Sequence, residues 1–477
     1  MFQKILRWIR EVLSKMFSTQ NVKQALGVDI AISPLMGDAL QRWSDMYEGR
    51  SPWLSADTES LNLPATIAGE IARLVTIEMQ VDVTGSPRAV FLAEQMRPVL
   101  TRIRQDVEKG CAKGGLWWKP YIKGSVIAVD TVQADQGYPV SFDSSGKMTA
   151  CVFSDQRKIR QYWYTRLEYH SLVGTSYNIR NAAFRSSDTS SLGQPIQLTE
   201  VEEWADIQPE ATILNVTAPL FGYFRYPIAN NIDTTSPLSV SCYSRAQDGS
   251  NVKLIQRADE IFSNLMWEFS SGKRLIYADE LAFELGTDGK PKLPDKRLYR
   301  TLKSTGDIGG KQNKLFDEWS PEFREAAIKS GLNDTMREIE FVCGLAYGTL
   351  SDPQTVDKTA TEIKISQQRS YSTVTDCQKS RQTALDSLLY AMDVWATLGG
   401  LAPRGTYAAN YEFDDSVITD KELQFAQDMQ LKAGGMMPGY MFLMRNRGLD
   451  EATAKKWITE TQAEQPEPND LFGDAGA

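Results

Sequence analysis

The feature that most constrains the fold of this chain is one long helical stretch without a continuous apolar face. After a turn at residues 348–353, helical sequence with Thr355 as expected N-cap runs to about Leu398, which is roughly 40 residues or ~60 Å of helix. Its first half, EIKISQQRSYSTVTDCQKSRQT, has only a thin apolar stripe. A helix this polar gains little from its own subunit's core, so we expect it to lie against copies of itself or to line a hydrated space. The apolar positions are Ile363, Tyr371, Val374 and Cys377 in the first half, and Ala384, Leu385, Leu388, Leu389, Met392 and Trp395 in the second.

The charge of the chain bears on its partners. The 477 residues carry a formal net charge of -9, whereas proteins that grip nucleic-acid phosphates usually carry a basic excess. We therefore expect no tight binding to nucleic acid, although a surface along which DNA slides is compatible with this charge. The 11 tryptophans indicate large buried cores or subunit interfaces.

Cysteine spacing and the first residues indicate the compartment. The five cysteines are odd in number and show no CxxC spacing, which favours a reduced cytosolic environment. Residues 1–17, MFQKILRWIREVLSKMF, predict a basic amphipathic helix that docks on a partner protein or on a membrane surface. The segment is too charged to span a membrane and no cleavage site follows it. We therefore expect neither secretion nor membrane insertion.

Periodicity divides the first half of the chain into helices followed by strands. Helices are predicted at 33–49, with Ser33 as N-cap, and at 61–78 and 87–109. Alternation of apolar and polar residues between turns then predicts a β meander over 115–185. The first half is therefore expected to be a mixed α+β domain.

Helical periodicity returns at about residue 237 and continues to Gly272. A short strand, RLIYA, and loop-rich sequence follow. Pro321 then opens a second helix, which we expect to be broken or bent near Gly331. The last predicted segments, beyond the long helix, are a strand TYAANYEF, helices at 419–433, 438–446 and 450–461, and a disordered acidic tail over 463–477.

Residue types that carry nucleophilic or metal chemistry are scarce. His170 is the single histidine and lies in an alternating segment, so zinc sites and His-activated nucleophiles are nearly excluded. The segment SSGKRL at 270–275 is not a phosphate loop, because Trp267 occupies the required upstream glycine position and Arg274 the Ser/Thr position. We expect no catalytic residue, no metal and no cofactor.

A hydrolase that uses two carboxylates stays open as an alternative, since acids are abundant and such sites have no fixed sequence spacing. Glu202–Glu203 and Asp414–Asp415 are the densest candidates, but adjacent acids at turns are normally solvated. The alternatives are therefore a hydrolase anchored at a membrane surface by residues 1–17, or a bacterial membrane-surface scaffold.

Several longer segments have a familiar order. They are MFQKILRWIREVLSKMF, RWSDMYEGRSPWL, YWYTRLEYH, NNIDTTSPLSVSCYSRA, ADEIFSNLMWEFSSGKR, LAYGTLSDPQTVDKTATEI and YMFLMRNRGLDEATAKKWI. Together they resemble the portal proteins of tailed bacteriophages, most closely those of long-tailed phages (siphoviruses) of Gram-positive hosts. The resemblance covers most of the chain. One departure is QDGS at 247–250, which interrupts an expected stem helix.

The resemblance implies a non-enzymatic α+β protein with an α/β wing, a helical stem, a small β-containing clip, a long tunnel helix and a helical crown. The implied divisions are the N-terminal arm and wing (1–236), first stem helix (237–272, with the helix proper at 251–272), clip (273–320), second stem helix (321–346), tunnel loop (347–357), long helix with a returning wing strand (358–418), crown (419–462) and tail (463–477).

The resemblance also implies a dodecameric ring at one capsid vertex of the virion, assembled in the host cytoplasm. Double-stranded DNA would pass through it without sequence readout during packaging and ejection. The implied partners are the major capsid protein, a scaffold, the large terminase subunit and a head-completion or tail adaptor protein. The residues expected near DNA are Thr349, Ser351, Asp352, Gln354, Thr355 and Lys358, and those expected to face clip partners are Lys273, Arg274, Lys290, Lys296, Arg297 and Arg300.

Overall fold

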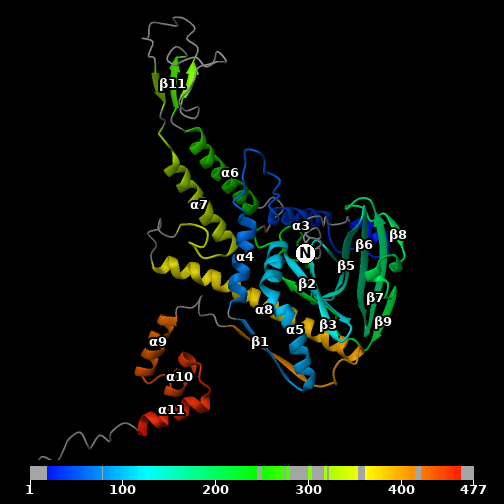
Figure 1. The fold of residues 1–477 in the computed structure, drawn as a ribbon. Coiled ribbons are helices and arrows are strands. Elements are labelled where there is room, and N and C mark those ends of the chain that lie inside the picture. Colours follow the sequence, from blue (N-terminus) through cyan, green and yellow to red (C-terminus); the bar gives the residue numbers. More distant parts are fainter. Residues whose placement is uncertain are drawn as a thin grey trace, which may run out of the picture. The chain divides into compact units, whose positions relative to one another are not determined.

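The computed structural model divides into two compact units. The larger is built from most of the chain up to Tyr411, and the smaller chiefly from residues after it (Figure 1). The predicted helix at 1–17 and the tail beyond residue 463 lie outside the described residues. The structure describes residues 19–77, 79–243, 250–272, 275–279, 299–302, 316–319, 322–352, 360–413 and 421–463.

The helices before the main sheets are α2 (Thr19–Leu26), α3 (Pro34–Tyr47), α4 (Leu63–Thr76) and α5 (Pro87–Lys113). Ser33 caps α3 as predicted, and its side chain accepts a hydrogen bond from the backbone N–H of Met36. α5 ends at Gly114, whose φ of 82° favours glycine. A Cβ there would lie 2.9 Å from the carbonyl oxygen of Ser239, so the helix end and the chain near Ser239 approach closely.

The β meander predicted for 115–185 is confirmed and spreads over two antiparallel sheets. β1 (Met79–Gly85) pairs with β14 (Tyr407–Phe413); the sequence predicted β14 but not β1. The first meander sheet has the order β10 (Gly222–Arg225), β2 (Gly115–Lys123), β3 (Val126–Gln133), and the second has the order β4 (Gly137–Phe142), β5 (Met148–Ile159), β6 (Tyr162–Val173), β7 (Ser176–Ser186), β8 (Gln194–Ile196), with β9 (Glu210–Leu214) also paired to β7.

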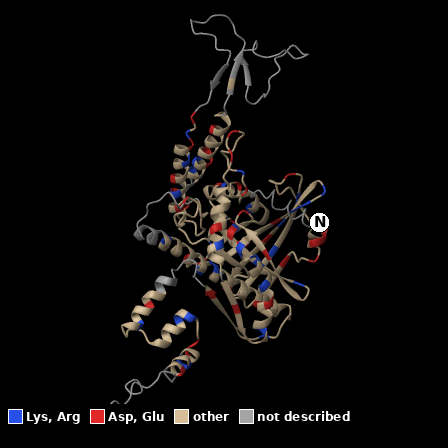
Figure 2. Ribbon diagram, turned by 60° about the vertical axis from the view of Figure 1, so that its left-hand side comes forward, with Lys and Arg blue, Asp and Glu red and all other residues tan. Residues whose placement is uncertain are grey.

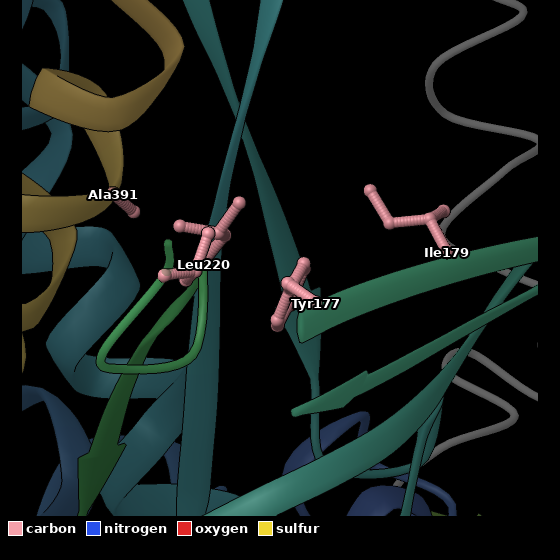
Figure 3. Packing of buried hydrophobic residues seen from close by; sticks show 5 residues of the cluster. Tyr177, Ile179, Leu220 and Ala391 are labelled. Atoms are coloured by element: carbon pink, nitrogen blue, oxygen red, sulfur yellow. The ribbon is translucent and has the colours of Figure 1, made fainter. Parts of the chain in front are cut away.

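The long predicted helix is present as α8 (Ala360–Leu398), and its second half is a core element of the larger unit. It packs against β10 and β2. Near its end Ala391 and the loop residue Leu220 point toward Tyr177 on β7, and all three are buried (Figure 3). A Cβ on Gly222 of β10 would lie only 2.4 Å from the backbone oxygen of Ala384. Glycine is therefore what allows this close approach of strand and helix.

The expectation that the polar part of α8 is not held by its own subunit is wrong from Val374 onward. Val374 and Cys377 are buried, and so are the polar residues Gln378 and Arg381. The guanidinium of Arg381 donates to the backbone oxygen of Val75 at the end of α4. Polar residues therefore contribute to the buried face, and counting apolar positions underestimated it.

Two antiparallel helices, α6 (Ser250–Ser271) and α7 (Glu325–Cys343), pack against each other and form a hairpin (Figure 1). The chain between them contains a small sheet of β11 (Leu275–Asp279), β12 (Tyr299–Leu302) and β13 (Phe316–Trp319). β12 runs parallel and β13 antiparallel to the central β11. This agrees with the predicted strand RLIYA inside a small β-containing insert.

α6 agrees with the helix proper expected at 251–272, whereas α7 is shorter than the expected range 321–346. Residues 237–243 are not helical, because their polar groups bond elsewhere: the Tyr243 hydroxyl donates to the Trp43 oxygen and the Cys242 N–H to the Cys111 oxygen. α7 ends at Gly344, which adopts φ 74°. Of the break or bend expected near Gly331, the break is absent, because α7 runs through this residue.

The smaller unit contains α9 (Lys421–Ala433), α10 (Gly439–Arg447) and α11 (Glu451–Ala463), close to the predicted bounds. Phe442 and Ala454 are its buried apolar residues in the described part. Buried Asp428 accepts hydrogen bonds from the side chains of Arg445 and Asn446. Much apolar surface stays uncovered in this unit, including Phe425, Met429, Leu431, Met436, Met441 and Trp457.

Candidate functional site

The far end of the α6–α7 hairpin is fixed by one carboxylate. Glu268 accepts three hydrogen bonds from Arg324: from the backbone N–H at 3.1 Å, from Nε at 3.2 Å and from Nη2 at 2.8 Å. These bonds lower the pKa of Glu268. Phe269 and Phe323 lie beside them, with ring centroids 5.9 Å apart. These contacts therefore fix the axial position of α6 relative to α7.

Each helix of the hairpin also has an exposed face. On α6 this face, opposite the buried Ile255, Ala258 and Leu265, carries residues of both charges and one large aromatic residue, Trp267, which is 62% exposed. Charged residues of both signs are interspersed along the two helices (Figure 2). The α6 face consists of Lys253, Arg257, Glu260, Asn264 and Trp267, and the α7 face of Ala327, Ser330, Asp334, Glu338 and Phe341.

α7 leads into a short loop, residues 345–352, that is held back onto the helix. Gly344 takes the left-handed conformation, and the Leu345 N–H donates to the backbone carbonyl oxygen of Glu340, as is common at the end of a helix. Glu340, on the buried side of α7, has no exposed surface and accepts hydrogen bonds from the loop. Further along, the N–H of Asp352 donates to the side-chain oxygen of Asn333 at 2.7 Å.

α8 contacts the same loop through Arg369. The guanidinium of Arg369 lies 4.4 Å from the ring centroid of Phe341 and 5.4 Å from that of Tyr347, distances at which cation–π attraction is effective. A Cβ on Gly344 would lie 2.5 Å from the hydroxyl of Thr373 on α8. The end of α7, the loop and α8 are thus in direct contact.

The structure describes only part of the sites predicted from sequence. The Thr349 hydroxyl donates to the Ala346 oxygen, Ser351 is buried with its hydroxyl on Glu340, and Asp352 is exposed. The loop thus brings these three together, and their proximity to DNA stays a prediction. The predicted site residues outside the described side chains are Gln354, Thr355, Lys358, Lys273, Arg274, Lys290, Lys296, Arg297 and Arg300.

The single histidine belongs to a buried polar cluster rather than to an open site. His170 Nδ1 lies 2.7 Å from the Tyr177 hydroxyl, and Nε2 lies 2.8 Å from Glu168. Glu168 also pairs with Lys119 and Arg166. Burial lowers the pKa of His170, despite the opposing effect of Glu168. The cluster joins β2 to β6 and β7 inside the larger unit.

Other reactive groups are equally enclosed. All five cysteines are free and buried, and burial raises the pKa of the Cys111, Cys151 and Cys242 thiols well above its usual value. Glu203 pairs with Arg157 on the protein surface, while Asp414–Asp415 lie outside the described residues. Among the described side chains, no group of three or more His, Cys, Asp or Glu is placed to hold a metal ion. In the same residues, no helix is both long and apolar enough to cross a membrane.

Sequence reasoning missed the residues that organise the hairpin and its loop. Glu340 follows Thr335, Met336 and Ile339 on the buried face of α7, so an acid at a core position was a readable signal. Trp267 lies at helical spacing from Lys253, Arg257 and Asn264. That spacing could have indicated an exposed aromatic residue.

Comparison with known protein families gives a match over most of the chain. A family model described as "Phage portal protein, SPP1 Gp6-like" matches residues 101–467, well over half of the chain. No curated protein matches the chain.

Proposed function

The chain belongs to the SPP1 Gp6-like phage portal proteins, and we propose that it forms a ring at one vertex of a virion capsid. The ring, a dodecamer by the resemblance in sequence, is the passage for double-stranded DNA during packaging and ejection. It is also the docking platform for capsid and scaffold proteins, for the large terminase subunit and for a head-completion or tail adaptor. The force for packaging comes from the terminase, not from this chain.

The observation that carries the proposal is the pair of dissimilar exposed faces on α6 and α7. A ring with cyclic symmetry needs heterologous contacts, in which one patch of each subunit meets a different patch of the next. The α6 face and the α7 face each lie opposite the buried side of their own helix. They therefore suit contact with two different neighbours.

The two faces are also complementary at equal height. The helices are antiparallel with the same rise, so the contacts of Phe269 with Phe323 and with Lys329 place Trp267 level with residues between 325 and 331. The small residues Ala326 and Ala327, both exposed, lie there. The α7 face of the next subunit thus offers room for the Trp267 ring.

Charges support the same register. By the same count Arg257 on α6 is level with residues between 335 and 341 on α7, which include the acid Glu338. Glu260 lies level with Asp334, which has the same charge. Arg257, however, is one turn from Glu260 on α6 and within reach of both Asp334 and Glu338 of the neighbour. A contact between subunits therefore brings basic and acidic side chains together and favours one orientation of the neighbour.

In this assembly we assign α6 and α7 to the stem, β11–β13 to the clip, and α9, α10 and α11 to the crown. The loop after α7 and the stretch to α8 form the tunnel loop. The acidic character of the chain, with net charge -9, limits adhesion of DNA, because few counterions are released on contact. That suits a passage through which DNA must move in both directions.

Site-directed cross-linking tests the ring. Asn264 on α6 is level with Ser330 on α7, and each lies on the exposed face of its own helix. We expect the variant Asn264→Cys/Ser330→Cys, treated with a short bis-maleimide, to give a ladder of covalent oligomers on a denaturing gel. Either single variant should stay monomeric, since the native cysteines are buried.

The outcomes separate the ring from its interface. Dimers from one single variant would mean that like faces meet, which excludes a head-to-tail ring through this face. Rings visible by electron microscopy without a ladder would mean that the α6 and α7 faces are not the contact. Absence of rings even during co-assembly with capsid and scaffold proteins would refute the proposed function.

A further inference from the structure

The loop at 345–352 surrounds a carboxylate that belongs to the preceding helix. One oxygen of Glu340, Oε1, accepts hydrogen bonds from the N–H groups of Leu350 at 2.5 Å and Ser351 at 2.8 Å. The other, Oε2, accepts from the Gly348 N–H at 3.2 Å and from the Ser351 hydroxyl at 2.9 Å. Four donors of one short loop therefore converge on a single side chain.

This arrangement has the form of an anion receptor. Backbone N–H groups that point into one concavity attract negative charge, as they do in phosphate-binding loops. Gly348 has φ 87°, a conformation that L-residues rarely adopt, and this conformation turns its N–H inward with those of Leu350 and Ser351. Here the group that fills the concavity is the side-chain carboxylate of Glu340 from the same chain, and it is completely buried.

The burial of Glu340 makes the contact strongly interdependent. A buried carboxylate without partners is costly, and so are buried N–H groups without acceptors. Each side of the contact therefore satisfies the other. The Gly348 N–H has a second acceptor, the Ser351 hydroxyl oxygen at 3.2 Å, whereas the Leu350 and Ser351 N–H groups both donate to Glu340. If the contact opens, the free-energy cost is therefore larger than that of breaking four separate hydrogen bonds on the surface.

We propose that Glu340 is the positioning residue of this loop: its carboxylate fills a receptor made by the loop backbone and fastens residues 348–351 to α7. The loop then moves as one body with the second helix of the hairpin. The assignment of a tunnel role to this loop rests on the proposed function, whereas the receptor itself does not.

The first test measures amide hydrogen exchange in the assembled protein. In Glu340→Ala, the amides of Leu350 and Ser351 lose their acceptor, while that of Gly348 keeps only the Ser351 hydroxyl oxygen. We expect exchange at Leu350 and Ser351 to speed up by at least ~10-fold, as for a loop released to local opening. Glu340→Gln keeps one acceptor oxygen but places an amide donor against the remaining loop donors. Its exchange rates should therefore lie between those of the wild type and those of Glu340→Ala. Glu322→Ala removes an exposed acid just before the same helix and should change nothing at the loop.

Chemical rescue distinguishes a receptor from general packing. Formate is the smallest carboxylate and should enter the space that Glu340→Ala leaves. We expect about 100 mM formate, compared with chloride at equal ionic strength, to restore slow exchange in this variant and to have no effect on the wild type. Unchanged exchange in Glu340→Ala, or no rescue by formate, would overturn the proposal.

Two further measurements keep the test decisive. If Glu340→Ala fails to fold, Ser351→Ala removes only the hydroxyl that donates to Glu340 and accepts from Gly348. The amides of residues 350 and 351 keep Oε1 of Glu340 and should still exchange slowly, and fast exchange at residue 350 would contradict the receptor. DNA packaging by Glu340→Gln rings should be slower than by wild-type rings. Loosened amides with normal packaging would retain the receptor and refute the tunnel role, so the two ideas fail separately.

Discussion

Replacing Trp267 by alanine is the sharpest single perturbation of the proposed ring. The side chain is 62% exposed on α6, so its loss leaves the fold of the subunit nearly unchanged. A buried tryptophan covers up to ~250 Å², and the exposed fraction therefore corresponds to ~150 Å² that a neighbour can cover. At ~25 cal/mol per Å², complete burial contributes ~4 kcal/mol per contact and half burial ~2 kcal/mol.

These values translate directly into assembly. In a ring each subunit makes one such contact as donor and one as acceptor, so Trp267→Ala should raise the protein concentration at half-assembly by ~30-fold to ~700-fold. Mass photometry across a dilution series measures this concentration, and near-ultraviolet circular dichroism checks the fold. Leu214→Ala is the matched control, because Leu214 is 66% exposed on β9, away from the hairpin. Equal half-assembly concentrations for Trp267→Ala and wild type would refute the stem contact.

Two further predictions concern the larger unit itself. Gly222→Ala would place a Cβ 2.4 Å from the backbone oxygen of Ala384, so we expect it to lower the free energy of unfolding by ~1–3 kcal/mol or more. In the control Gly37→Ala, nothing lies within 4 Å of the added Cβ, and the change should be neutral or stabilising. Denaturant titration compares the two variants, and equal unfolding midpoints would contradict the close approach. Burial lowers the pKa of His170, so the unfolded chain takes up this proton first, near pH ~6.5. Stability from neutral His170 is thus present above that pH and lost as the pH falls toward the folded pKa, by at most ~1.4 kcal/mol per pH unit. Because His170 is the single histidine, the slope of unfolding free energy between pH 7 and 5.5 should flatten in His170→Gln, and an unchanged slope would show that other groups cause it.

Local sequence signals predicted the regular elements well and their burial less well. Ser33 with Pro34 has one easy interpretation, a capped helix start, and the structure agrees. The alternation at 115–185 likewise predicts the strands because side chains of a strand point to opposite faces. In contrast, β1 is short and stands between two helices, where one alternating run is a weak signal.

Burial of polar residues on α8 escaped prediction for a physical reason. Arg381 can be buried because the Val75 carbonyl oxygen, some three hundred residues earlier, accepts a hydrogen bond from its guanidinium. Sequence periodicity contains no information about such a distant acceptor. The same holds for Glu340, since the donors that satisfy it become a receptor only when the loop closes on α7. Hydrophobic patterns thus predict where apolar surface is covered, but not which polar groups complete the cover.

The embedding of α8 has a mechanical consequence. Its second half is built into the core of one subunit, while Arg369 near its other end touches Phe341 and Tyr347. The helix is therefore fixed in the core at its second half and contacts the loop near its first. A force on the loop at 345–352 passes through Arg369 to α8 and along this helix to the sheet strands β10 and β2 of the same subunit.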